Sequence, residues 1–182
     1  MKTLFIDTHY RDIIIVLLEN GKVVDKEEVI NKKNNSEYIF PTIIKVIDGI
    51  LLDEIIVVNG PGSFTGVRLG VTIAKTLAYT LNIPIKCVSS LQSVAVSTNA
   101  LKVALSDENG YYVGLFASDY KLVEDYTYVD SETFKNMNHD NSYETNYSLD
   151  MEKIYDFVKN NVSQENVHGV KPIYVKKIGA LK

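Results

Sequence analysis

The chain has 182 residues and a mass of 20.5 kDa, enough for one domain or two small ones. Its apolar fraction of 46% and charged fraction of 23% are those of an ordinary globular chain and exclude a disordered one. The longest aliphatic run, Ile13 to Leu18, is far shorter than the roughly 20 residues of a membrane helix. No signal-peptide pattern precedes it, and the single cysteine, Cys87, excludes an internal disulfide. We therefore expect a cytoplasmic protein without membrane attachment.

Charge is distributed unevenly between the two halves of the chain. Residues 1–100 carry 10 Lys/Arg and 10 Asp/Glu, whereas residues 101–182 carry 9 and 13, which gives the total of −4. Neither half has the basic stripe that drives nucleic-acid binding. Any role on a nucleic acid would therefore have to work through a partner.

The first half of the chain alternates predicted strands and helices. The predicted elements are strands at 3–6, 12–18 and 22–30, a helix at 37–48, a strand at 54–59, a helix at 67–81, a strand at 85–88 and a helix at 89–98. Asn20-Gly21 is a hairpin turn between the second and third strands. Asn35 or Ser36 is the expected N-cap of the first helix, which carries Pro41 in its second turn.

This order, β-β-β-α-β-α-β-α, is that of the ribonuclease-H-like lobe used by the actin and sugar-kinase superfamily, so the predicted fold class is α/β, actin-like (ASKHA). After residue 100 the pattern changes. The predicted elements there are strands at 101–106, 111–117 and 122–129, a short helix at 131–137 and a helix at 150–161. We interpret the repeated three-strand pattern as a duplication. It predicts an N-terminal lobe of residues 1–100 and a shortened second lobe of residues 101–182.

The glycine-rich segment from Gly60 to Gly66 joins a predicted strand to a helix, where backbone N–H groups and the helix dipole favour an anion. It lacks the Lys-Ser/Thr of a Walker A loop and is one residue too long for a dinucleotide fingerprint. The segment is therefore either a vestigial anion site or a packing element. The candidate residues of this loop and its surroundings are Asp7, Thr8, Gly60, Gly62, Ser63, Thr65, Gly66 and Arg68.

Two of these candidates have alternative interpretations of their own. Asp7 ends the first strand where a nucleotide-bound metal is coordinated in the actin and sugar-kinase superfamily, but an acid at a strand end is also a common turn former. Arg68 either faces solvent or pairs with Asp7 or Glu37. The three histidines, His9, His139 and His168, lack metal-ligand spacing, and Ser63 has no identifiable base. We therefore predict no catalytic residue, no metal and no cofactor.

Small residues recur every four positions from Gly62 through Gly66, Gly70 and Ala74 to Ala78. In the helix they form a stripe that faces either the chain's own sheet or another subunit. The helix at 37–48 carries more apolar residues than a narrow core stripe needs. We predict that the two helices form a subunit interface, with the candidate residues Ile39, Phe40, Ile43, Ile44, Ile47, Gly70, Ala74 and Ala78.

Several of these segments together resemble the TsaB/YeaZ family. The segments are Ile6-Asp7-Thr8, Asn35-Ser36-Glu37 with Pro41, the run from Gly60 to Gly70, Ala74-Lys75 and Val88-Ser89-Ser90-Leu91. The resemblance covers residues 1–100, and beyond them only Pro172 to Lys176 is similar to the family's Pro-x-Tyr-Leu-Arg ending. This chain has His9 where the family often has Ser, and Asn35 where it often has His.

The resemblance implies a non-catalytic scaffold subunit. Members of the family pair with their paralogue TsaD, which carries the metal-binding histidines and the transfer chemistry, and the ATPase TsaE joins the pair. The product is threonylcarbamoyladenosine 3′ of the anticodon in tRNAs that read codons beginning with A, so tRNA would be reached only through the complex. Alone, such a chain could form a homodimer.

Two other functions stay open. A nucleotide-dependent phosphotransferase of the actin and sugar-kinase superfamily would use Asp7-Thr8 and the loop at Gly60, but the second half offers no glycine-rich loop for an adenosine. A peptidase, a label attached to this family in the past, would lack both metal ligands and a nucleophile–base pair.

Overall fold

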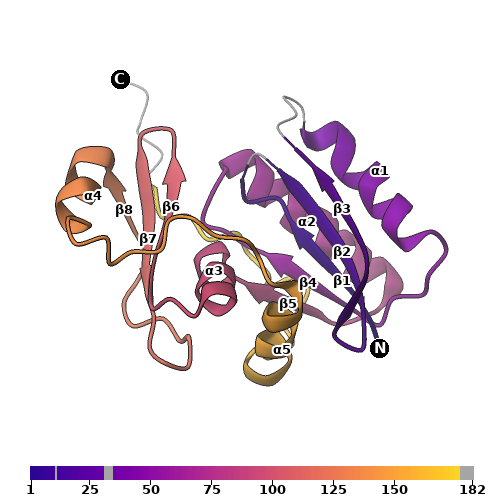
Figure 1. Cartoon of the computed structure of the whole chain (residues 1–182). Helices are drawn as coiled ribbons and strands as arrows, with labels where there is room; N and C mark the ends of the chain where they lie inside the picture. The colour runs from indigo at the N-terminus through magenta and orange to yellow at the C-terminus, as the bar shows by residue number, and fades with distance from the viewer. Residues whose placement is uncertain (11, 31–34, 177–182) are drawn as a thin grey trace.

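The computed structural model describes residues 1–10, 12–30 and 35–176, which form a five-stranded and a three-stranded sheet with five helices (Figure 1). In chain order the elements are β1 (Lys2–Asp7), β2 (Ile13–Glu19), β3 (Lys22–Val29), α1 (Asn35–Ile47), β4 (Glu54–Val58), α2 (Phe64–Leu81), β5 (Ile85–Val88), α3 (Ser90–Thr98), β6 (Lys102–Asp107), β7 (Gly110–Leu115), β8 (Thr127–Asp130), α4 (Ser131–Met137) and α5 (Met151–Asn161). This order confirms the predicted fold class.

The five-stranded sheet has the strand order β3-β2-β1-β4-β5. β1 is antiparallel to β2, and β1, β4 and β5 are parallel to one another. Asn20 and Gly21 make the tight turn between β2 and β3 with positive φ angles of 50° and 82°. The carboxyl ends of the three parallel strands therefore lie at one edge of the sheet, where α2 and α3 also begin.

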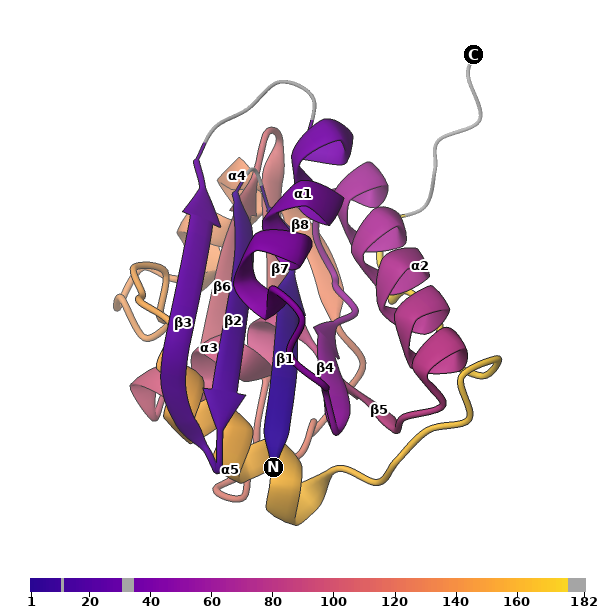
Figure 2. The ribbon, with the colours of Figure 1, turned by 90° about the vertical axis from the view of Figure 1, so that its right-hand side faces the viewer.

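The strands β1, β2 and β4 of this sheet are buried on both faces, whereas the edge strand β3 is mostly exposed. Leu4 and Ile6 point into a core beneath α1 and α2, while Phe5 and Val16 point into a second core on the opposite face, where they meet Ile154 of α5 (Figure 2). Successive residues of a strand face opposite sides of the sheet. The unbroken apolar run of β1 therefore supplies two cores at once.

The helix α5 departs from the expected division of the chain at residue 100. Its inward residues, Ile154, Phe157 and Val158, lie among side chains of the first sheet, as their helical spacing predicts for a buried face. The division into lobes of residues 1–100 and 101–182 therefore describes the two sheets, whereas α5 returns to the first one. The first sheet needs this helix because its second face would otherwise leave apolar side chains in water.

The second sheet, β6-β7-β8, is antiparallel and lies between α3 and α4. The prediction of a strand over residues 122–129 is wrong in its first part. The chain makes a single bridge between Phe116 and Leu122, and β8 begins only at Thr127. The side chains of residues 121–125 are exposed, so this stretch has no sheet face to bury.

Helix boundaries follow the capping residues. α2 begins three residues earlier than predicted because Ser63 caps it, accepting the N–H of Gly66 at its Oγ. α3 is capped by Ser89, whose Oγ accepts the N–H of Gln92. The expected cap of α1 at Asn35 or Ser36 concerns side chains outside the described part of the structure. None of the helices in the described residues is long and apolar enough to cross a bilayer.

Candidate functional site

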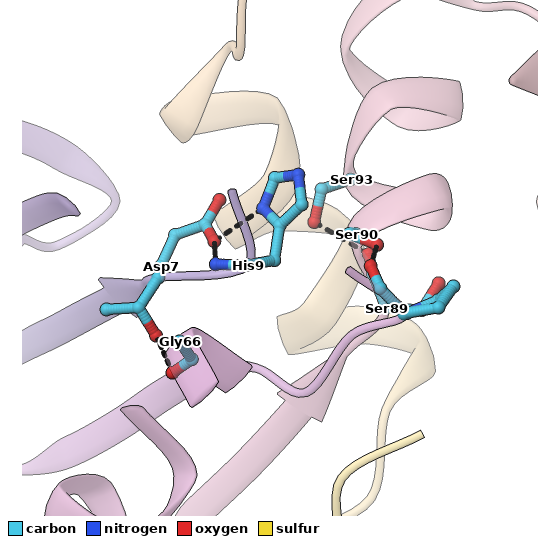
Figure 3. Close-up of polar contacts among 8 residues, drawn as sticks. Asp7, His9, Gly66, Ser89, Ser90 and Ser93 are labelled. Carbon is cyan, nitrogen blue, oxygen red and sulfur yellow. Dashed lines mark hydrogen bonds and ion pairs between the residues drawn. The ribbon is translucent and has the colours of Figure 1, made fainter. Parts of the chain in front are cut away.

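Polar residues gather where the parallel strands end. Asp7, Asn59 and Ser89 directly follow or end β1, β4 and β5. Together with the loops that they open, residues 7–9, 59–66 and 89–90 form what we call the strand-end site (Figure 3). In open α/β sheets, ligands bind outside the carboxyl ends of strands, so this edge is the natural place for a functional site.

A buried Asp–His pair lies at the centre of the strand-end site. The Oδ1 atom of Asp7 lies 2.7 Å from Nδ1 of His9 and also accepts the backbone N–H of His9 at 3.0 Å. The two residues are only 2% and 6% exposed. The outer atoms of the pair, Oδ2 of Asp7 and Nε2 of His9, have no hydrogen-bond partner among the described residues. Asp7 and His9 are only two residues apart, so an acid at the end of a strand with a histidine two residues later is the sequence pattern that could have predicted this pair.

No hydroxyl group of the described residues is hydrogen-bonded to the His9 ring of the Asp–His pair. Figure 3 shows the ring of His9 directed toward α3, where Ser90 and Ser93 lie. Their hydroxyl groups donate instead to backbone carbonyls, Ser90 to Pro61 and Ser93 to Ser89. No group of three or more His, Cys, Asp or Glu in the described residues could hold a metal ion. In this arrangement the aspartate orients the histidine ring, but no described hydroxyl is placed for attack.

The glycine-rich loop packs directly on the end of β1. A Cβ atom at Gly62 would overlap the carbonyl oxygen of His9, and one at Gly66 would overlap that of Thr8. The Oγ1 of Thr8 donates to the carbonyl of Gly66 at 2.7 Å, and the N–H of Ser63 donates to the carbonyl of His9 at 2.7 Å. These contacts support the second interpretation of the loop, that of a packing element. Asp7 and Thr8 also bond within the chain, to His9 and Gly66.

Three of the remaining candidates face outward, whereas Gly60 is buried. Ser63 and Thr65 are exposed, and so is Arg68. The guanidinium of Arg68 lies 4.7 Å above the ring of Phe64. The carboxylate of Asp7, one of the two partners considered for Arg68, pairs with His9 instead. Gly60 has a positive φ of 97° and lies against Val67 and the carbonyl of Ile173, so it too has a packing role.

The small-residue stripe faces the chain's own core. Ala74 and Ala78 are buried in the cluster beneath α1 and α2, and a Cβ at Gly70 would overlap Oγ1 of Thr8. Helical spacing left open whether the stripe faces the chain's own sheet or a partner subunit. Its burial within the chain favours the sheet. Gly70, Ala74 and Ala78 are consequently covered without a partner, which corrects their place in the expected interface.

The apolar residues of α1 divide between two faces. Ile39 and Ile43 are fully buried against the sheet, with Val46, which the sequence pattern missed. Phe40 and Ile44 are 51% and 47% exposed, and Ile47 is half-buried. Ile39 and Ile43 are therefore out of reach of a partner, and of the candidates on α1 only Phe40 and Ile44, with part of Ile47, belong to its outward surface.

Tyrosines of the second half close over the strand-end site. The hydroxyl of Tyr112 donates to the carbonyl of Gly62 at 3.3 Å, and that of Tyr126 lies 2.6 Å from Oγ of Ser89. Burial raises the pKa of both tyrosines. Burial, and then the nearby Asp7 carboxylate, raises the pKa of Tyr147. These groups remain neutral at physiological pH and occupy the space that faces the glycine loop.

Fold and site together define a class of protein: a ribonuclease-H-like, actin-like α/β protein whose strand-end site is closed by its own second sheet. The sequence model of the TsaD family, described as tRNA N6-adenosine threonylcarbamoyltransferase, matches residues 33–108. The chain is 41% identical over 102 residues to the tRNA threonylcarbamoyladenosine biosynthesis protein TsaB of Bacillus subtilis, a match covering 53% of this chain and 44% of that protein. It is 31% identical over 97 residues to TsaB of Haemophilus influenzae, covering 50% and 41% of the two chains.

The fold extends the similarity beyond these matched residues. The solved structure of YeaZ from Pseudomonas aeruginosa superposes with a TM-score of 0.75 at 17% identity, covering 96% of this chain and 99% of that one. The chain is thus similar in sequence to TsaB proteins over about half of its length, and similar in fold to YeaZ over nearly all of it. Its match spans less than half the length of the curated relatives.

Proposed function

We propose that this protein is a non-catalytic scaffold subunit that pairs with TsaD. In that role it acts in the cytoplasm and supports threonylcarbamoyl transfer to the adenosine 3′ of the anticodon in tRNAs that read codons beginning with A. The names of the B. subtilis and H. influenzae relatives place those proteins in this biosynthesis. Pairing with TsaD, recruitment of TsaE and self-association of the free chain are parts of the same proposal.

The observation that carries the proposal is the outward face of α1. The helix already buries Ile39 and Ile43 against its sheet, so Phe40 and Ile44 are surplus to the core. Exposed aromatic and aliphatic side chains on one helix face are typical of a surface that another protein covers. The proposed interface is accordingly narrower than the sequence pattern predicts.

α2 contributes its N-terminal end to this interface. Phe64 and Arg68 lie on the outward side of the helix, with the guanidinium stacked on the ring, and Tyr174 lies beside Phe64 with ring centroids 5.2 Å apart. Aromatic and arginine side chains are enriched where interfaces gain most of their binding energy. We place Phe40, Ile44, Ile47, Phe64 and Arg68 at the proposed interface, which would bury roughly 1,200–2,000 Å² if it is stable.

The strand-end site supports the scaffold role over the phosphotransferase alternative. The hydroxyls of Tyr112 and Tyr126 bond to Gly62 and Ser89, so the chain's own side chains already contact the glycine loop and the start of α3. The backbone of residues 8 and 9 takes up the space beside Gly62 and Gly66, so that no phosphate group could bind there. The negative charge of the second half, 9 Lys/Arg against 13 Asp/Glu, favours reaching tRNA through the complex rather than directly.

The interface is tested by charge substitution on α1. Phe40→Asp and Ile44→Asp should each weaken TsaD binding, measured by isothermal titration, by about 2 kcal/mol, which is roughly 30-fold. Val123→Asp, at a side chain 64% exposed in the second half, is the matched control and should bind normally. Unchanged affinity of both α1 variants would refute the interface.

The absence of catalysis is tested by subunit omission. Threonylcarbamoyl transfer to tRNA should require TsaD and should not proceed with this chain as the only protein. Turnover by this chain alone, or stoichiometric ATP binding to it, would overturn the scaffold assignment and support the phosphotransferase.

A further inference from the structure

The C-terminal residues 163–176, which we call the strap, enter the proposed function only through Tyr174, which lies beside Phe64. After α5 the chain has no further helix or strand within the described residues. Figure 2 shows it passing β5 and continuing behind α2. The strap includes Pro172 to Lys176, a motif that lies about 100 residues from the glycine loop in sequence and contacts it in space.

The first part of the strap is fixed to the five-stranded sheet. The N–H of Glu165 donates to the carbonyl of Ile85 at 3.0 Å, which adds an antiparallel bridge to the edge strand β5. Val170 is buried in the core beneath α2. Lys75 of α2 donates to the carbonyl of Val170 at 3.1 Å, so a residue of the family motif holds the strap by its backbone.

The middle of the strap is held at the strand-end site. The N–H of Ile173 donates to the carbonyl of Asn59 at 2.8 Å, and the side-chain amide of Asn59 donates to the carbonyl of Lys171 at 3.2 Å. A Cβ at Gly60 would lie 3.1 Å from the carbonyl oxygen of Ile173, so the glycine permits this close approach. Tyr174 then packs beside Phe64 of α2.

The last described residues of the strap contact the second sheet. Val175 packs into the core that β6 and β7 share with α3. Nζ of Lys176 lies 3.0 Å from Oδ2 of Asp107 and 4.7 Å from the ring centre of Tyr128. Adjacent residues, Tyr174 and Val175, thus contact different lobes, and the strap bridges the two sheets over the strand-end site.

The closed arrangement leaves buried polar atoms without partners. Oδ2 of Asp7, Nε2 of His9 and Oδ1 of Asn59 are buried at the strand-end site and make no hydrogen bond within the described residues. Burying such atoms costs free energy that water would restore if the lobes moved apart. Hydration therefore favours opening, and the contacts of the strap oppose it.

We propose that the strap is a clamp that holds the two lobes closed over the strand-end site and that its release opens this site to solvent. Two fastenings of the clamp, one on each lobe, can be removed singly: the backbone bond from Ile173 to Asn59, and the contacts of Lys176 with Asp107 and Tyr128. Loss of either fastening shifts the balance toward the open state without removing a core residue.

Paired spin labels test the clamp in the full-length chain. Cysteines replace the exposed residues Val24 on β3 and Glu132 on α4 in a Cys87→Ala background, and each carries a nitroxide spin label. Double electron–electron resonance then measures the distance between the two labels, one on each lobe. Ile173→Pro removes the N–H that Asn59 accepts, and Lys176→Ala removes the fastening to the second sheet. Lys171→Ala is the matched control because that residue bonds through its carbonyl and its side chain is exposed.

We expect a second, longer distance in Ile173→Pro and Lys176→Ala, with its population raised roughly five-fold for each lost hydrogen bond, and no change in the control. Circular dichroism verifies that each variant is folded. A single, unchanged distance in both variants would overturn the clamp. If Ile173→Pro does not fold, Lys176→Ala decides alone, since its side chain lies at the end of the strap and outside both cores.

Discussion

The two antiparallel meanders, β1-β2-β3 and β6-β7-β8, share their connectivity and differ in how they are buried. β1 and β2 have apolar side chains on both faces and separate two cores. In the second meander, the face toward α4 has a small core of Ala104, Val113 and Phe134. Parallel strands β4 and β5 extend the first meander and let helices cover both of its faces. The difference indicates that the first sheet carries most of the hydrophobic stabilisation.

The second meander is joined to the first by polar aromatic contacts. Nine of the twelve tyrosines lie beyond residue 100, and several of them line the junction of the two sheets. Tyr112 and Tyr126 each combine a buried ring with a hydroxyl that bonds to the first lobe. A tyrosine can thus pack in a core while its hydroxyl finds a partner. The second sheet depends on docking to the first, and three experiments test this asymmetry.

The largest expected effect is at the contact between α2 and the end of β1. Gly70→Leu would place its side chain onto Thr8, and overpacking should lower the free energy of unfolding by about 3 kcal/mol, measured by urea denaturation. Thr72→Leu, at an exposed position of the same helix, is the control and should change stability little. If Gly70→Leu has normal stability but no longer binds TsaD, the small-residue stripe is part of the subunit interface after all.

A second experiment, with a largest effect of similar size, compares the two cores directly. Ile154→Ala leaves a cavity between α5 and the first sheet and should cost about 3 kcal/mol, whereas Val113→Ala in the second sheet should cost about 1 kcal/mol. Hydrogen exchange should accelerate in both sheets for Ile154→Ala and only in β6–β8 for Val113→Ala. Equal acceleration in the two sheets for both variants would mean that the molecule unfolds as one unit.

The smallest effect concerns the tyrosine junction and depends on pH. Burial raises the pKa of Tyr126 in the folded protein, so its stabilising contribution is fully present below the unfolded pKa of about 10 and is lost as pH rises further. Tyr126→Phe should cost about 1 kcal/mol at neutral pH through the lost bond to Ser89. Its deficit relative to the parent should shrink above pH 10.

Chemical denaturation from pH 7 to 11 measures this profile. Tyr79→Phe, at an exposed ring, is the matched control for the loss of a hydroxyl. A deficit of Tyr126→Phe that stays constant or grows with pH would contradict a buried, neutral phenol at the junction.

Several features of the site were predictable in part because they depend on neighbours in sequence. The glycine loop, Asp7 and Thr8 were predicted as one cluster, and the structure brings them into contact. The pairing of Asp7 with His9 was not predicted, although the two residues are adjacent to Thr8, because a turn had to bring the imidazole back onto the carboxylate. The sequence also left open which element packs against the glycine loop and the stripe that follows it. Periodicity shows which residues share a helix face, but it does not show what covers that face.

The sequence by itself determined the order of strands and helices and the Asn20-Gly21 turn, since each depends on residues that are close in sequence. Only the tertiary structure decided that α5 returns to the first sheet and that the strap meets the glycine loop. It also decided which apolar residues of α1 and α2 stay exposed. The physical reason is that local propensity and periodicity act within a segment, whereas these contacts join segments as far apart as Gly60 and Ile173.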